Sequence, residues 1–339
     1  MLSNTDGGSL ISRRSFICAS ATGVVMATGG VGLGQQPTTV PPAPRVKGPA
    51  VWLEMDQGEL DAAYDQSVWA PNWQPIVRRW ATNSEAVRAR LGAPLRYAYG
   101  ATPIEGLDVY ATKRPNAPIN VFIHGGAWRM GLAKDSAFPA ELFVHAGAHF
   151  VVPDFAAVQD VGGSLLPLAD QVRRAVAWVH RNAQRFGGDS NRIYVSGYSS
   201  GGHLAGVVLT TDWRKDFNLP ADTVKGGLCC SGMFDLKPVR LSARGKYINF
   251  TDAMEEALSP QRHLSKLQAP LIVAYGGTLE SPEFQRQSRS FAEAAQAAGK
   301  AVLLLVGDGY NHFEVIETLG NPYGLLGRAV LDQMQLART

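Results

Sequence analysis

The pattern that most constrains how this chain can fold is Gly-Tyr-Ser-Ser-Gly at residues 197–201, which matches G-x-S-x-G. The residues before it, 192–196, are rich in β-branched and aromatic side chains and predict a short buried strand, while residues 202–209 predict a helix with a small-residue face. A serine on so sharp a strand-to-helix turn has a strained backbone, and strand and helix pass close beside it. The flanking glycines therefore predict a nucleophile elbow at Ser199, the alternative being an ordinary serine in a glycine-rich turn.

Strands and helices alternate along most of the chain, which predicts an α/β fold. The clearest helix covers residues 170–186, where Val172, Val176 and Val179 fall at helical spacing and two glycines follow. Alternation of this kind predicts a mostly parallel central sheet with helices on both faces. Further helices are expected at residues 59–64, 74–91, 282 onward and 325–336, and strands at residues 95–99, 107–111, 119–123, 148–152, 224–230, 270–275 and 301–306.

Composition excludes some classes of protein. The chain has 339 residues, of which 45% are apolar and 18% charged, so we expect a large folded core rather than a disordered chain. The net charge is only +3 and the basic residues are scattered, which predicts no nucleic-acid partner. Cys229 and Cys230 are adjacent, where a bridge would be strained, so no structural disulfide is expected.

The first 34 residues resemble a signal for export rather than a part of the fold. The stretch SRRSFI at residues 12–17 resembles the twin-arginine consensus, and the weakly apolar run after it is too glycine-rich for a convincing membrane span. Gly-Leu-Gly at residues 32–34 predicts cleavage near Gln35. We therefore expect the bacterial twin-arginine machinery as a partner and a periplasmic or secreted protein without a stable span. An uncleaved anchor or a chance arginine pair are the alternatives.

Two segments of the expected domain, residues 51–339, are candidates for a small lid. The preceding residues, 35–50, are rich in Pro, Thr and Gly and predict a linker. Residues 51–92 are dense in aromatic side chains and could lie across the mouth of a site or simply pack on the core. Residues 232–268 lack clean periodicity and predict an insertion that could contact substrate.

Only one of the seven histidines stands where a base for Ser199 is expected. A serine hydroxyl needs a base to take its proton and a third group to orient that base, and after an elbow the acid and then the histidine follow along the chain. Four histidines precede Ser199, His203 lies one helical turn past it, and His263 comes before the strand that should supply the acid. His312 lies in a glycine-rich loop after the last strand and is predicted as the base.

Two glutamates compete for the role of the acid after the strand at residues 270–275. Glu283 falls in the first turn of the helix that Ser281 and Pro282 begin, where a carboxylate complements the helix dipole. Glu280 lies before that cap, free to reach His312, and is preferred. Asp308 is a third candidate.

A second glycine-rich turn predicts donors for an oxyanion. The run HGGAW at residues 124–128 follows a buried strand, and its glycines let backbone N–H groups come close to a substrate. Gly126 and Ala127 are the predicted donors, with the N–H of Ser200, and the alternative is a plain tight turn. His124 is expected to brace this loop. Three aromatic residues are candidate substrate contacts, the first of them equally well a core residue: Trp128, Tyr198 and Tyr310.

Four stretches together resemble the α/β-hydrolase group that contains kynurenine formamidases and hormone-sensitive-lipase-like carboxylesterases. They are HGGAW, GYSSGGHLA, SGMFDL at residues 231–236 and SPEFQRQSRSF at residues 281–291, and the similarity runs from about residue 50 to the end. In that group the acid directly precedes SPEF and is usually Asp, which implies Glu280 here. The resemblance implies an α/β-hydrolase fold.

These residues lead us to expect an exported serine carboxylesterase that acts on small or medium esters. Ser199, His312 and Glu280 would form the triad, and no metal or organic cofactor is expected, since no His, Cys and carboxylate cluster has ligand spacing. An aryl formamidase with the same machinery is the first alternative. A non-catalytic ligand-binding protein on a hydrolase scaffold is the second.

Overall fold

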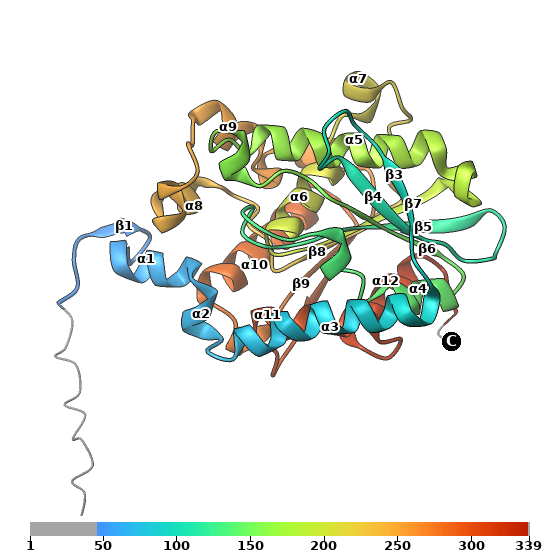
Figure 1. Cartoon of the computed structure of the whole chain (residues 1–339). Helices are drawn as coiled ribbons and strands as arrows, with labels where there is room; N and C mark the ends of the chain where they lie inside the picture. The colour runs from blue at the N-terminus through green and yellow to red at the C-terminus, as the bar shows by residue number, and fades with distance from the viewer. Residues whose placement is uncertain (1–45, 338–339) are drawn as a thin grey trace, which may run out of the picture. The chain divides into compact units, whose positions relative to one another are not determined.

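One eight-stranded sheet runs through the part of the chain that begins at Lys47 (Figure 1). Neighbouring strands are parallel except that β3 pairs antiparallel with β4 and β4 antiparallel with β6. This arrangement confirms the expected α/β fold with a mostly parallel sheet. The strands lie in the order β10 (Val302–Val306), β9 (Leu271–Tyr275), β8 (Gly226–Cys230), β7 (Gly188–Tyr198), β5 (Ala117–Ile123), β6 (His149–Pro153), β4 (Gly106–Tyr110) and β3 (Leu95–Ala98).

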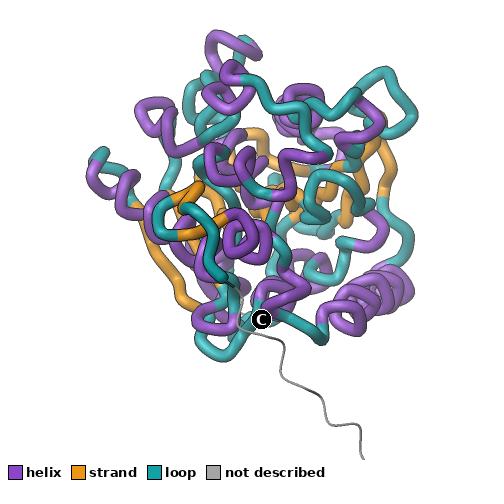
Figure 2. Tube along the Cα trace, turned by 90° about the vertical axis from the view of Figure 1, so that its left-hand side faces the viewer, coloured by secondary structure: helices purple, strands orange, loops and turns teal. Residues whose placement is uncertain are grey.

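Helices cover both faces of the sheet, and each face has its own apolar core. Figure 2 shows the strands between helices on either side. On one face Leu168, Leu204 and Phe291 belong to the larger core cluster, and on the other Phe143 and Val330 belong to the second. The first face carries α1 (Gln57–Tyr64), α5 (Leu166–Asn182), α6 (Ser200–Leu209) and α10 (Pro282–Ala297), and the second carries α3 (Trp73–Leu91), α4 (Ala140–His145) and α12 (Leu325–Gln333).

The structure, a computed structural model, describes residues 46–337. The predicted export signal and most of the predicted linker therefore lie outside the described residues. Within them, no helix combines the length and apolar character that crossing a bilayer requires. The remaining helices and strands are short: β1 (Ala50–Trp52), β2 (Met55–Asp56), α2 (Gln66–Trp69), α7 (Trp213–Phe217), α8 (Lys237–Leu241), α9 (Asp252–Ala257) and α11 (His312–Val315).

Most elements lie within three residues of their expected bounds, and two differ by four residues at one end or both, for local reasons. The helix expected at residues 170–186 begins at Leu166, with a proline in its first turn, and its last four residues, Ala183–Phe186, form a 3-10 helix. Gly187 then adopts a φ of 82°, which ends the helix as its glycine predicts. Strand β7 begins at Gly188, because Gly188 pairs with Ala117 of β5.

The segment at residues 232–268 consists of short helical turns without strands, which explains its missing periodicity. It contains α8, α9 and two 3-10 helices, η4 (Ala243–Lys246) and η5 (Pro260–Lys266). Cys229 and Cys230 precede it on β8, where both are buried free thiols. Burial raises the pKa of each thiol well above its usual range.

Candidate active site

Ser199 stands on a strained turn between the end of β7 and the start of α6. Its φ is 58° and its ψ is −124°, a conformation that non-glycine residues rarely adopt. A Cβ atom at Gly197 would overlap the carbonyl oxygen of Gly201, and a Cβ atom at Gly201 would overlap that of Ile123. Both positions of the G-x-S-x-G pattern therefore need glycine because backbone passes there, which is the physical basis of the predicted elbow.

The structure brings Ser199, His312 and Glu280 together from three separate loops. Nε2 of His312 lies 3.0 Å from Oγ of Ser199, and Nδ1 of His312 lies 2.5 Å from Oε1 of Glu280. A carboxylate can only accept, so Nδ1–H donates to Glu280 and leaves Nε2 to accept from the serine hydroxyl. All three are buried, at 6%, 2% and 0% exposure.

Two further groups fix the carboxylate of Glu280, and sequence reasoning missed both. Oγ of Ser231 donates to Oε2 at 2.9 Å, and the backbone N–H of Gly276 donates to the same oxygen at 2.5 Å. Ser231 directly follows β8 and has a φ of 49°. The only signal for it in the sequence is a serine one residue past a buried strand.

Neither of the other acid candidates faces His312. Glu283 is buried, but its carboxylate accepts from Nε of Arg286 at 2.8 Å and from the hydroxyl of Tyr64 at 3.4 Å. Asp308 is exposed in the loop before the histidine. Glu280 is thus the carboxylate that contacts the imidazole.

The loop at residues 124–128 lies directly against Ser199. A Cβ atom at Gly125 would lie 3.1 Å from Cβ of Ser199. Gly126 and Ala127 have φ values of 119° and 54°, and the carbonyl of Gly126 accepts from the N–H of Arg129 at 2.9 Å. Among residues 46–337, no acceptor takes the N–H of Gly126 or Ala127.

Ser200 contributes the third N–H that the sequence singles out. It is the first residue of α6, so its N–H has no partner within the helix. Free backbone donors beside a nucleophilic serine can accept the negative charge that develops on a carbonyl oxygen.

Two histidines near the site have bracing contacts instead of proton-transfer contacts. Nδ1 of His124 lies 2.9 Å from the carbonyl oxygen of Gly125, and its ring stacks on Phe155 at 4.3 Å. His203 is fully buried, with Nε2 2.8 Å from the carbonyl oxygen of Leu258, and burial lowers its pKa to about 4. Its Nδ1 therefore accepts, from the indole N–H of Trp128 at 3.2 Å.

The three candidate substrate contacts have different surroundings. Of the two alternatives for Trp128, core residue or pocket wall, the structure has the core residue: Trp128 is 1% exposed and belongs to the larger core, where its bond to His203 fixes it. Tyr198 is 3% exposed, with its ring 5.0 Å from that of His312 and its hydroxyl without a partner in the described chain. Burial, and then the charge of Glu280, raises the pKa of Tyr198. Tyr310 is 39% exposed.

The turn before α3 packs against the loop that carries His312. The side-chain amide of Asn311 donates to the side-chain oxygen of Asn72 at 3.0 Å, and Asn72 donates to Glu314 at 3.2 Å. Trp73 stacks on Phe313 with ring centroids 6.0 Å apart. This part of the N-terminal segment therefore borders the site, and a lid function for it stays a prediction.

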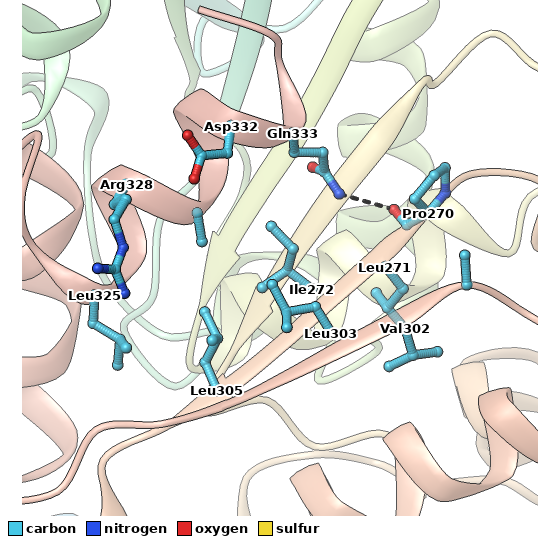
Figure 3. A pocket seen from close by; sticks show the side chains of 12 residues that line it. Pro270, Leu271, Ile272, Val302, Leu303, Leu305, Leu325, Arg328, Asp332 and Gln333 are labelled. Carbon is cyan, nitrogen blue, oxygen red and sulfur yellow. Dashed lines mark hydrogen bonds between the residues drawn. The ribbon is translucent and has the colours of Figure 1, made fainter. Parts of the chain in front are cut away.

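A separate groove of about 670 Å³ lies along β9, β10 and α12, and it contains none of these groups. Figure 3 shows Arg328, Asp332 and Gln333 on its helical side and leucine and isoleucine side chains of the sheet facing them. The described residues that line it include no serine, cysteine or histidine. Elsewhere in residues 46–337, no three His, Cys, Asp or Glu side chains come together in a way that could hold a metal ion.

Comparison with protein families and curated proteins finds hydrolases among the relatives of this chain. The family model BD-FAE matches residues 107–227. The chain is 30% identical over 299 residues to a kynurenine formamidase of Danio rerio, with 83% of this chain and 97% of that protein covered. It is also 28% identical over 233 residues to the esterase LipC of Mycobacterium tuberculosis, covering 61% of this chain and 56% of that one.

Comparison with solved structures supports the fold. The crystal structure of the esterase LipW from Mycobacterium marinum superposes with a TM-score of 0.63 at 17% identity. The match covers 80% of this chain and 90% of LipW. At that identity the likeness concerns the architecture alone.

Proposed function

Because the chain belongs to the kynurenine formamidase family of α/β-hydrolases, we propose that this hydrolase cleaves small or medium carboxylic esters through an acyl-enzyme on Ser199. The observation that carries the proposal is the 3.0 Å contact between Oγ of Ser199 and Nε2 of His312, with Glu280 on the other ring nitrogen. Esterases among its relatives support carboxylesterase activity in general.

In the first half of the reaction, Ser199 attacks the ester carbonyl carbon while Nε2 of His312 takes the hydroxyl proton. Glu280 keeps the imidazole oriented and stabilises its positive charge. The N–H groups of Gly126, Ala127 and Ser200 bond the oxyanion, and each such donor contributes about 3–4 kcal/mol to the transition state. His312 then gives its proton to the leaving alcohol, and the acyl group stays on Ser199.

In the second half, water replaces the alcohol. His312 takes a proton from the water as its oxygen attacks the acyl carbon, and the same N–H groups bond the second oxyanion. Collapse of this intermediate returns the proton from His312 to Ser199 and releases the carboxylic acid. The cycle uses only groups of this chain and water.

Turnover of p-nitrophenyl esters tests the proposal. We expect Ser199→Ala to lose activity by at least about 10⁴-fold while its thermal midpoint stays close to that of the wild type. Equal rates for the two proteins would refute the proposal. A series of acyl chain lengths then defines the size of ester that the site accepts.

Aryl formamidase activity is the second candidate, because the 30% identical relative is a kynurenine formamidase. Hydrolysis of an N-formyl arylamine would use the same groups, with the formyl carbon in place of the ester carbon and the arylamine as leaving group. Comparing kcat/KM for N-formylkynurenine with that for phenyl acetate decides between them. A ratio above about 100 would favour the formamidase.

We also propose export through the twin-arginine route, on the residues SRRSFI at positions 12–17. Replacing both Arg13 and Arg14 by lysine should retain the enzyme in the cytoplasm. Fractionation of cells that express the two forms measures this directly. Equal amounts of both forms in the periplasm would contradict the proposal.

A further inference from the structure

Arg244 is a buried guanidinium without a carboxylate partner in the described chain. It lies on η4 and is 9% exposed. Nη2 donates to the carbonyl of Tyr64 at 2.9 Å and Nη1 to the hydroxyl of Tyr247 at 3.2 Å, while Nε has no acceptor. A buried charge without a counter-ion is destabilising, so its position calls for an anion that the chain itself does not supply.

The guanidinium lies near two aromatic rings, one in the loop at residues 124–128 and one that connects to His312 through Phe284. On one side its central carbon is 5.7 Å from the ring of Trp128, which follows the two proposed oxyanion donors. On the other it is 6.0 Å from the ring of Tyr64, which packs on Phe284, and Phe284 in turn contacts the ring of His312 at 4.9 Å. The elements around it pack together, because α1 contacts both α8 and α10, and Figure 1 shows the three close to one another.

The carboxylates around Arg244 bond to other groups. Asp61 on α1 accepts from the N–H of Ala243 at 2.6 Å and from the amide of Gln57 at 2.9 Å. Glu283 pairs with Arg286. A second cation adds to the local charge, because the guanidinium of Arg129 lies 4.7 Å over the ring of Tyr247, the same residue whose hydroxyl bonds Arg244.

We propose that Arg244 binds a carboxylate carried by the substrate, so that the enzyme prefers anionic esters or amides over neutral ones of the same size. The inference rests on the proposed function, since it assigns a substrate class to that site. Bonding to Nε–H and an Nη–H would satisfy the unpartnered donor, and a planar guanidinium suits two parallel bonds to a carboxylate. The positive charge of Arg129 would attract the same carboxylate from a longer distance.

Two pairs of substrates test the preference, one for each side of the scissile bond. In the first pair, monomethyl adipate carries a carboxylate on the acyl side of the ester, and methyl hexanoate is its neutral counterpart. In the second pair, 4-acetoxybenzoate carries the carboxylate on the leaving group, and 4-acetoxybenzamide is its neutral counterpart. We expect the wild type to favour the anionic member of at least one pair in KM, and Arg244→Gln to lower that preference at least about tenfold, the size of a charged hydrogen bond.

Arg240→Gln is the matched control, because Arg240 on α8 pairs with Asp252 and Glu255. It should leave the preference as in the wild type. Should Arg244→Gln fail to fold, Arg244→Lys keeps the charge without the planar pair of donors and should lose most of the preference. Calorimetric titration with adipate measures binding without turnover, with weaker binding expected for either Arg244 variant.

The outcomes separate this inference from the proposed function. A wild type that hydrolyses both members of each pair with equal KM would overturn the inference and leave the esterase proposal standing. A preference that persists in Arg244→Gln would also overturn it. If no ester is hydrolysed the esterase proposal fails, and tight, Arg244-dependent adipate binding would still support the anion site.

Discussion

The two sides of the candidate site differ in how completely their polar groups are bonded. On the acid side, both oxygens of Glu280 accept hydrogen bonds, one from His312 and the other from Ser231 and Gly276. On the arginine side, Nε of Arg244 has no acceptor among residues 46–337. Polar groups that are fully hydrogen-bonded within the chain hold their catalytic geometry before substrate binds. An unpartnered buried donor gains its missing hydrogen bond only when a ligand binds. Substitutions on the acid side should therefore lower the turnover of every substrate by the same factor. The effect of substitutions on the arginine side should depend on the charge of the substrate.

The largest effect should separate the two buried glutamates. Glu280→Gln retains the shape but replaces the charge that orients and stabilises His312, so we expect kcat to fall by about 10³–10⁴-fold. Glu283→Gln breaks its pair with Arg286 and should mainly lower the free energy of unfolding, with kcat within about tenfold of wild type. Steady-state kinetics and thermal denaturation of both variants measure this. A larger loss of kcat in Glu283→Gln would reverse the assignment.

The next effect concerns the oxyanion loop. A Cβ atom at Gly126 would overlap the carbonyl oxygen of Met130, and its φ of 119° disfavours any side chain. Gly126→Ala should therefore displace the donors and lower kcat by about 100-fold, with KM nearly constant. The matched control is Gly92→Ala, since Gly92 also has a positive φ, 89°, but open space around it. Equal kcat losses in the two variants would point to backbone strain instead.

A smaller effect is expected at Ser231, which positions Glu280 without contacting substrate. Removing its hydroxyl in Ser231→Ala leaves Gly276 as the one donor to Oε2, and we expect kcat to fall by about tenfold. The factor should be the same for charged and neutral esters, unlike the effect at Arg244. Ser288→Ala is the control, because the buried hydroxyl of Ser288 has no partner in the described chain. A substrate-dependent loss at Ser231 would erase the distinction between the two sides.

The last effect concerns stability and not turnover: it is the dependence of the free energy of unfolding on pH at His203, the residue that accepts from Trp128. Burial lowers the pKa of His203 from 6.5 to about 4. Between these values His203 binds a proton in the unfolded chain but not in the native chain, so its contribution to stability declines as pH falls from 6.5 to 4, by about 3 kcal/mol in full. His203→Asn should flatten this part of the curve in urea denaturation, and the exposed His145→Asn should not. The same slope in both variants would exclude His203 as its source.

Much of this site could be predicted from the sequence, because the relevant constraints are local. The elbow depends on glycines at positions where backbone passes within contact distance, and those glycines are visible at 197 and 201. The preference for Glu280 over Glu283 follows from the helix start at Ser281 and Pro282, which puts one glutamate in the loop and the other on the helix. His312 follows from chain order.

The parts of the site that could not be predicted depend on contacts between segments that are distant in sequence, which no local pattern encodes. Ser231 contacts Glu280, which lies 49 positions later in the sequence, because β8 and β9 are neighbouring parallel strands. Arg244 is one arginine in a segment without periodicity, and its burial depends on α1 packing beside it. Trp128 could be core or pocket from sequence, and its bond to His203 decides for core.

Covalent labelling by a fluorophosphonate tests the central claim most directly, since only an activated serine reacts quickly with this probe. Intact-mass spectrometry should show one adduct on the wild type, and peptide mapping should place it on Ser199. Ser199→Ala should remain unlabelled, and His312→Gln should label at least about 100-fold more slowly because the serine loses its base. A folded wild type that stays unlabelled, or an adduct on another residue, would contradict the account and favour a ligand-binding protein on a hydrolase scaffold.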